Sequence, residues 1–305
     1  MHVSFRQLRL FLALVETGSV SGAAKRSHVT QPTASMQLKE LSEQIGEPLF
    51  EVISRKVHLT YAGERLTKSA RAMFDEWQSF EQEMALMKGL TKGRLKVAAV
   101  STAKYFIPQM LGDFCKSHPD IEIAFEVLNR DGVVQRLENN QDDLYIMSMP
   151  PSHLEIEDEI FMSNPIVIIA PKNHPLANKK NLELKDLKHE KFVMRERGSG
   201  TRMTVDAYFR KRHFNPTIRL ELGTNEAVRN SVAANLGIAA LSMHSLGDRI
   251  NRDITVLKVR DFPLLSHWHI VSLKGKKLSP LAVSFKAHLL ERLKTHKKSH
   301  PEGGV

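Results

Sequence analysis

Apolar residues recur with the period of an α-helix along the N-terminal part of the chain. A first amphipathic helix has its apolar positions at Phe5, Leu8, Phe11, Leu12 and Val15. A second short helix with two adjacent alanines follows, and a third begins at Thr30, whose hydroxyl can cap it. The apolar stripe of this third helix is Ala34, Leu38, Leu41 and Ile45. The pattern predicts a helix-turn-helix over residues 19–38.

The opposite face of the third helix is free to contact a partner, because Ser35, Met36 and Lys39 project away from the apolar stripe. Two short alternating segments then follow over 48–60 and predict a two-stranded wing with a basic tip. Winged helix-turn-helix proteins place the recognition helix in the major groove and the wing on the backbone or in the minor groove. We expect DNA contacts from Gln31, Pro32, Thr33, Ser35, Met36, Lys39, Arg55 and Lys56. A purely structural or protein-binding module is the alternative.

A longer helix is predicted from Thr60 onward, with apolar residues spaced alternately four and three apart. Its seam residues are Leu66, Ala70, Met73, Trp77, Phe80 and Met84. Such a heptad seam is typical of a helix that pairs with a second copy of itself. Gly89 and Gly93 then interrupt the helix. We therefore expect a homodimer, the alternative being that the seam packs against its own chain.

From Arg94 onward, short apolar strands alternate with helical stretches. The expected strands are 95–100, 121–128, 143–147, 166–170, 192–195, 218–222 and 238–242, and the expected helices are 106–117, 133–140, 201–212 and 226–235. This alternation predicts an α/β fold with parallel sheets covered by helices on both faces. Ligands of such sheets bind beyond the carboxyl ends of the strands, often at helix N-termini.

The composition and charge of the chain restrict the cellular location and the disulfide chemistry that we expect of the protein. The net charge of +10 over 305 residues is concentrated near the C-terminus, since residues 1–65 hold eight basic and six acidic side chains. The single cysteine, Cys115, excludes an internal disulfide. Arg9 and Glu16 interrupt the early apolar run, which argues against a signal peptide, and no run approaches membrane-spanning length. We expect a cytoplasmic protein without a membrane partner.

The N-terminal motifs resemble those of LysR-type transcriptional regulators. They are 5–9, Gly18-Ser19, Ala23-Ala24, Thr30-Gln31-Pro32, Ser35, Leu41, Ile45-Gly46, Pro48-Leu49-Phe50, Leu59-Thr60 and Ala62-Gly63. The resemblance implies a winged helix-turn-helix (1–60), a linker helix with its hinge (61–92) and an effector domain of the periplasmic-binding-protein type (93–305). Its two subdomains would be 93–163 with 268–305, and 164–267. The family often has Arg where this chain has Met36. The resemblance also implies that the protein forms tetramers and contacts RNA polymerase.

Two loops are suited to bind an anion between such subdomains. One follows the first strand and the other precedes a helix, and each supplies hydroxyls, backbone amides and a cation, although ordinary helix capping explains either loop alone. The expected effector residues are Ser101, Thr102, Lys104, Asn129, Arg130, Ser199, Gly200, Thr201, Arg202, Asn225 and Glu226. We expect Arg202 to be the nearest fixed cation for a small anionic metabolite.

Motifs of the effector domain are similar to those of the branch that regulates carbon dioxide fixation, the CbbR type. They include Tyr105-Phe106-Ile107-Pro108, Asn129-Arg130, Asn164-Pro165, His174-Pro175-Leu176-Ala177, Gly198–Arg202 and Asn225-Glu226-Ala227. This branch implies a phosphorylated sugar or a nucleotide as the signal. A LysR-type regulator of another metabolic operon is the nearest alternative.

Enzymatic alternatives lack their motifs. We find no Gly-rich phosphate loop, no paired metal-ligand histidines and no Gly-x-Ser-x-Gly elbow. A bifunctional repressor-enzyme of the biotin-ligase type would need a catalytic Gly-Arg-Gly-type loop, which is absent. A periplasmic ligand-binding module does not explain the N-terminal winged helix. We therefore expect no enzymatic activity, cofactor or metal.

Overall fold

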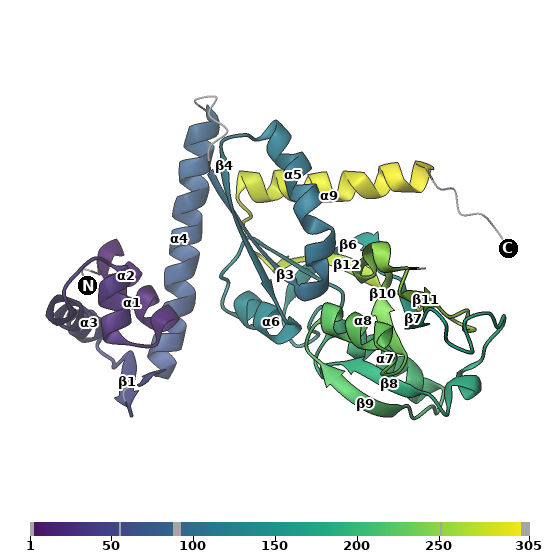
Figure 1. Ribbon diagram of the computed structural model, residues 1–305. Helices are drawn as coiled ribbons and strands as arrows, with labels where there is room; N and C mark the ends of the chain where they lie inside the picture. Colours follow the sequence, from purple (N-terminus) through teal and green to yellow (C-terminus); the bar gives the residue numbers. More distant parts are fainter. Residues whose placement is uncertain (1–2, 55, 88–92, 251, 300–305) are drawn as a thin grey trace. The chain divides into compact units, whose positions relative to one another are not determined.

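A computed structural model describes residues 3–54, 56–87, 93–250 and 252–299. The chain divides into two compact units, an N-terminal unit that runs to Met84 and includes Asn139–Gln141, and a C-terminal unit. The fold is α/β, as predicted, and we describe each unit by itself (Figure 1).

The N-terminal unit is a winged helix-turn-helix, which confirms the prediction. Its elements are α1 (Phe5–Thr17), α2 (Val20–Arg26), α3 (Gln31–Ile45), β1 (Phe50–Ile53), β2 (Lys56–Leu59) and α4 (Tyr61–Met87). Side chains of Ser4, Ser19 and Thr30 accept hydrogen bonds from backbone N–H groups of the first turns that they cap. The buried core includes Phe11, Ala24 and Leu38, so the apolar stripes of the first three helices meet.

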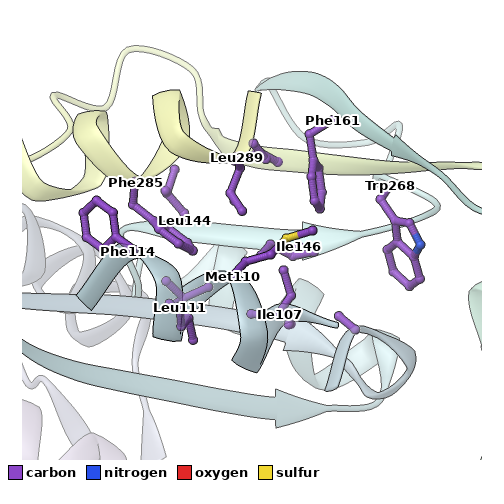
Figure 2. Close-up of a cluster of buried hydrophobic side chains, with 14 of the residues drawn as sticks. Ile107, Met110, Leu111, Phe114, Leu144, Ile146, Phe161, Trp268, Phe285 and Leu289 are labelled. Carbon is purple, nitrogen blue, oxygen red and sulfur yellow. The ribbon is translucent and has the colours of Figure 1, made fainter. Parts of the chain in front are cut away.

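The C-terminal unit begins with a five-stranded sheet in the order β4-β3-β5-β12-β6. Its elements are β3 (Gly93–Val100), η1 (Ser101–Tyr105), α5 (Ile107–Ser117), β4 (Ile121–Leu128), α6 (Arg130–Glu138), β5 (Leu144–Met147), β6 (Ile156–Ser163), β12 (His267–Leu273) and α9 (Pro280–Ser299). Leu144 and Ile146 face α5 and α9, whereas Tyr145 and Met147 face α6. Figure 2 shows the first of these two cores, with Phe114 of α5 close to Phe285 of α9.

The remaining strands form a second group in the same unit. Its elements are β7 (Ile166–Pro171), η2 (Leu184–Leu187), β8 (Lys191–Arg195), α7 (Gly200–Lys211), β9 (Thr217–Leu222), α8 (Asn225–Ala233), β10 (Ala239–Ser242), η3 (Met243–Ser245), η4 (Gly247–Arg249) and β11 (Ile254–Val256). Strand β7 lies between β10 and β11 in one sheet, and β8 pairs with β9 in another. An isolated bridge between Phe192 of β8 and Ile238, the residue before β10, connects these two sheets. Helices α7 and α8 pack on opposite faces through Phe209 and Val228, respectively.

The expectation of parallel sheets was only partly right. Strands β3, β4 and β5 are parallel, and so are β8 and β9, but β12 runs antiparallel to β5 and β6, and β7 runs antiparallel to β10 and β11. The connection from β6 to β7 spans only 164–165 and takes the chain from the five-stranded sheet to the sheet of β7, β10 and β11. This segment lies beside the returning chain, since the Asn164 N–H donates to the Ser266 carbonyl at 2.8 Å.

Candidate functional site

The recognition helix α3 has an exposed polar face opposite its buried stripe. Ala34, Leu38 and Leu41 are buried, while Gln31, Pro32, Ser35, Met36 and Lys39 are exposed. The exception is Thr33, which is half-buried and has its hydroxyl 2.8 Å from the Thr30 hydroxyl in the helix cap. Met36 is 55% exposed, so its apolar side chain is accessible to a partner. This face is therefore available to base edges.

The wing is a short hairpin in which Ile53 pairs with Lys56. Ser54 at its tip has a positive φ of 51°, which permits the tight reversal. Lys56 is exposed, as a contact to DNA phosphate requires, and the predicted contact Arg55 lies outside the described residues.

The predicted seam of α4 divides into two parts. Ala70 is fully buried and Leu66 packs beside it in the core of the N-terminal unit, so these two positions do not belong to a free pairing face. Their apolar side chains are already covered by α1 and its neighbours in the same unit. Met73, Trp77 and Phe80 are about half exposed, and Met84 is half-buried.

The exposed part of the seam is an aromatic surface. The Trp77 ring lies 5.6 Å from the Phe80 ring and 5.9 Å from the Phe5 ring, measured between centroids. The indole N–H of Trp77 donates to Glu81 at 2.9 Å. Exposed aromatic clusters are typical of protein interfaces, because the rings bury large apolar area.

In the C-terminal unit, the structure joins the first predicted loop to the first turn of α8. The Asn225 side-chain amide donates to the Thr102 hydroxyl at 2.9 Å, and both side chains are buried. Lys104 forms an ion pair with Glu226 at 2.8 Å. Burial is the largest single influence on Glu226 and opposes its charge, but the hydrogen bonds from Lys104, Tyr105 and the backbone together outweigh it and lower the pKa of the carboxyl to about 2.

A second cation at this junction is Arg195, which was not among the predicted effector residues. Its guanidinium is 3% exposed, donates to the Asn225 side-chain oxygen and lies 3.4 Å from the Ser101 hydroxyl. Its Nε and Nη2 donate to both carboxylate oxygens of Glu196, at 2.7 and 2.8 Å. We call Ser101, Thr102, Arg195, Glu196 and Asn225 the Arg195 cluster. A charged residue at the end of an apolar strand was the available signal.

Arg202 is paired with carboxylates in the structure. Its side chain is 5% exposed, and its Nε donates to both oxygens of Asp206 at 2.8 and 2.9 Å. Its Nη1 donates to the Arg195 carbonyl at 2.7 Å and to Glu221 at 3.1 Å. Two carboxylates thus neutralise this arginine, which anchors α7 to β8 and β9, and the prediction that Arg202 is the nearest fixed cation for an effector stays a prediction.

The turn before α7 lies against the loops that follow β4 and β5. A Cβ at Gly200 would lie 2.7 Å from the Ser148 hydroxyl oxygen, and Gly198, with φ of +92°, has Asp131 beside it. Ser199 accepts from the Arg202 N–H and caps α7, where Thr201 is buried in the first turn. The close approach at Gly200 leaves no space for a larger residue.

Asn129 and Arg130 also have local roles. Asn129 is exposed, and its side-chain oxygen accepts from the Gly132 N–H at 2.9 Å, as a cap of α6. The Arg130 Nε donates to the Met149 carbonyl at 3.0 Å. Two surface cavities of this unit, one beside Lys258 and one beside Lys172, contain none of the predicted effector residues. The Arg195 cluster is a set of direct contacts between η1, the end of β8 and the first residue of α8.

Two family models match this chain. Residues 5–64 match the bacterial regulatory helix-turn-helix protein, lysR family, and residues 88–294 match the LysR substrate binding domain. The chain belongs to the LysR family of transcriptional regulators. It is therefore a DNA-binding regulator with an effector-binding domain.

Similar proteins include regulators of carbon metabolism. The chain is 41% identical to a RuBisCO operon transcriptional regulator of Acidithiobacillus ferrooxidans, over 94% of each chain. It is 40% identical to the transcriptional activator CmpR of Synechocystis, over 94% of this chain and 95% of the relative. A solved structure of the Synechocystis CcmR regulatory domain in complex with 2-PG is 41% identical, with a TM-score of 0.64, over 66% of this chain and 97% of that domain.

The described residues bear on two further classes of function, membrane insertion and metal binding. None of the helices they form combines the length and the apolar character needed to cross a membrane. Within the same residues, no group of three or more His, Cys, Asp or Glu side chains is arranged to hold a metal ion.

Proposed function

We propose that this regulator controls genes of carbon dioxide fixation and that its effector is 2-phosphoglycolate. The names of its relatives support the target genes, and the CcmR domain complexed with 2-PG supports the effector. The polar Arg195 cluster supports binding of a small anion, because it places a buried guanidinium beside the hydroxyls of Ser101 and Thr102. A regulator of another metabolic operon would use the same cluster with a different anion.

We infer that the effector binds among the Arg195 cluster and the first turn of α7. Arg195 would supply the positive charge, Ser101, Thr102 and Thr201 the hydroxyls, and the backbone amide of Gly200 a further donor. A ligand that binds one arrangement of these loops better than another shifts the population toward that arrangement. Effector binding and DNA binding would then be coupled.

The remaining assignments follow from exposed surfaces. We propose that Gln31, Ser35 and Met36 face base edges and that Lys56 contacts the DNA backbone, with the protein acting in the cytoplasm, where DNA and RNA polymerase are. The division into residues 1–60, 61–92 and 93–305 belongs to this proposal. We also infer homodimers through Met73, Trp77 and Phe80. Sedimentation of a Trp77→Glu/Phe80→Glu variant as the wild-type oligomer would refute this pairing, since buried unpaired charges disrupt apolar contacts.

A thermal-shift titration of the full-length protein tests the effector. 2-Phosphoglycolate should raise the unfolding midpoint of the wild type, because a ligand that binds only the folded state stabilises it. Thr201→Val keeps the shape but removes a hydroxyl, and should reduce this rise substantially. The matched control is Thr204→Val on the same helix, because the Thr204 hydroxyl already donates to the Gly200 carbonyl at 3.0 Å within α7.

The two variants separate a ligand contact from a general effect on α7. A rise that persists in Thr201→Val would place the ligand away from this hydroxyl. An equal loss of the ligand-induced rise in the unfolding midpoint in both variants would mean that α7 itself is disturbed. Absence of any rise in the wild type would reject 2-phosphoglycolate as the effector.

A further inference from the structure

Arg195 and Glu196 form an ion pair between consecutive residues. Side chains of neighbouring residues in a strand point to opposite faces, so such a pair can form only where the chain leaves the strand. Arg195 is the last residue of β8, and Glu196 follows directly. The carboxylate folds back so that both of its oxygens accept hydrogen bonds from the guanidinium, at 2.7 and 2.8 Å.

Glu196 occupies the part of Arg195 that an anionic ligand would use. A guanidinium binds carboxylates and phosphates best through two parallel N–H groups. In this cluster the Nε and Nη2 groups are bound to Glu196, and Nη1 donates to Asn225. The pair is unevenly exposed, since the Arg195 side chain is 3% exposed and that of Glu196 is 25% exposed. Glu196 can therefore turn toward water, whereas Arg195 cannot.

We propose that Glu196 is an internal counter-ion that competes with the effector for Arg195 and thereby determines which anions bind. This inference rests on the proposed binding of an anion at the Arg195 cluster. A ligand with a single carboxylate that displaces Glu196 from Arg195 replaces one charge-assisted ion pair by an equivalent one, so it gains little. A ligand with a phosphate brings more negative charge and three acceptor oxygens, so it gains from the exchange. Glu196 thus excludes simple carboxylic acids and admits phosphorylated ones.

Other cations of the same region have separate partners. Arg202 is bound to Asp206 and Glu221, and Lys104 is bound to Glu226. Glu221 therefore provides a matched control for Glu196, because it also accepts hydrogen bonds from an arginine of this region but not from Arg195.

Isothermal titration of the full-length protein with 2-phosphoglycolate and with glycolate tests the proposal. Glycolate is the same acid without its phosphate. Relative to wild type, Glu196→Gln should bind 2-phosphoglycolate about tenfold more tightly and should bind glycolate measurably, because a neutral amide competes less well for a guanidinium than a carboxylate does. Glu221→Gln should leave both affinities within about twofold, because the Glu221 carboxylate accepts from Arg202 and from the Arg197 N–H and does not occupy the Arg195 guanidinium. Unfolding midpoints without ligand report whether each variant is folded.

Each outcome decides the question. An unchanged or weaker affinity of folded Glu196→Gln overturns the counter-ion role, even if the wild type binds 2-phosphoglycolate. An equal gain in Glu221→Gln overturns it as well, since a general change in charge would then explain the gain. If the wild type binds neither anion, a gain in Glu196→Gln supports the counter-ion and rejects only the proposed effector. If no variant binds either anion, both proposals fail.

Discussion

On the recognition helix, Ser35 and Lys39 extend into solvent from one continuous stretch of chain. In the Arg195 cluster, Ser101 and Asn225 come from distant segments and are connected through a buried guanidinium. The first arrangement separates folding from function, because the apolar face holds α3 in place and the polar face remains free. The second does not separate them, because the polar side chains that we expect to bind the effector also bind one another.

The largest expected difference between the two regions is in stability. Arg195→Leu should lower the free energy of unfolding by about 2 kcal/mol, because it leaves the buried Asn225 side-chain oxygen without its donor, whereas Glu196 can turn toward water. Lys39→Leu should change it by less than about 0.5 kcal/mol, since the Lys39–Glu43 pair is long, at 3.7 Å, and mostly exposed. Urea unfolding of both variants measures this difference.

Arg210→Leu is the control for the arginine side chain itself, since Arg210 is exposed on α7. It should resemble Lys39→Leu. Similar stabilities for Arg195→Leu and Arg210→Leu would show that the Arg195 cluster adds little to folding, and the contrast between the two regions would then disappear.

The sequence was sufficient to predict structure where the residues of a segment determine that segment's own conformation. The helices of the N-terminal unit follow from local spacing and from caps such as Ser19 and Thr30, and the core positions Ala34 and Leu38 are those of the apolar stripe. Strand β4 has the predicted bounds, Ile121–Leu128, because its apolar residues, interrupted only by Glu122 and Glu126, lie between the turn signals Pro119-Asp120 and Asn129.

Structure that depends on distant contacts could not be predicted in the same way. Strand β6 contains Glu157, Asp158 and Glu159 and forms an edge, so its pattern lacks a buried face until β12 pairs with it. The role of Arg195 could not be predicted for a similar reason. Its role is created by Asn225, a residue 30 positions away in sequence, and no local motif distinguishes it from Arg202.

A smaller effect is expected in DNA binding, where single exposed side chains can be changed one at a time. If Lys56 contacts a phosphate, Lys56→Ala should weaken binding to all sequences alike and reduce the salt slope by about 0.9. Ser35→Arg should instead change the sequence preference, because an arginine in the major groove can bind guanine. Binding titrations at several salt concentrations, with a target site and mismatched sites, distinguish the two. Unchanged slope and preference would contradict the proposed docking of α3 and the wing.

The smallest effect concerns the exposed edge of the effector region, where the Lys104–Glu226 pair is more than a third exposed and partly screened by solvent. The pKa of Glu226 is about 2 in the folded protein and ordinarily 4.5, so its charge stabilises the fold above pH 4.5, and this contribution is lost as the pH falls toward 2. Glu226→Gln lacks the contribution, so its free energy of unfolding should fall less steeply than that of the wild type across this range. Lys104→Met should produce a similar flattening, and combining the two should add little, since both remove one interaction. Acid unfolding curves of Glu226→Gln that run parallel to the wild type would show that this pair does not stabilise the folded state.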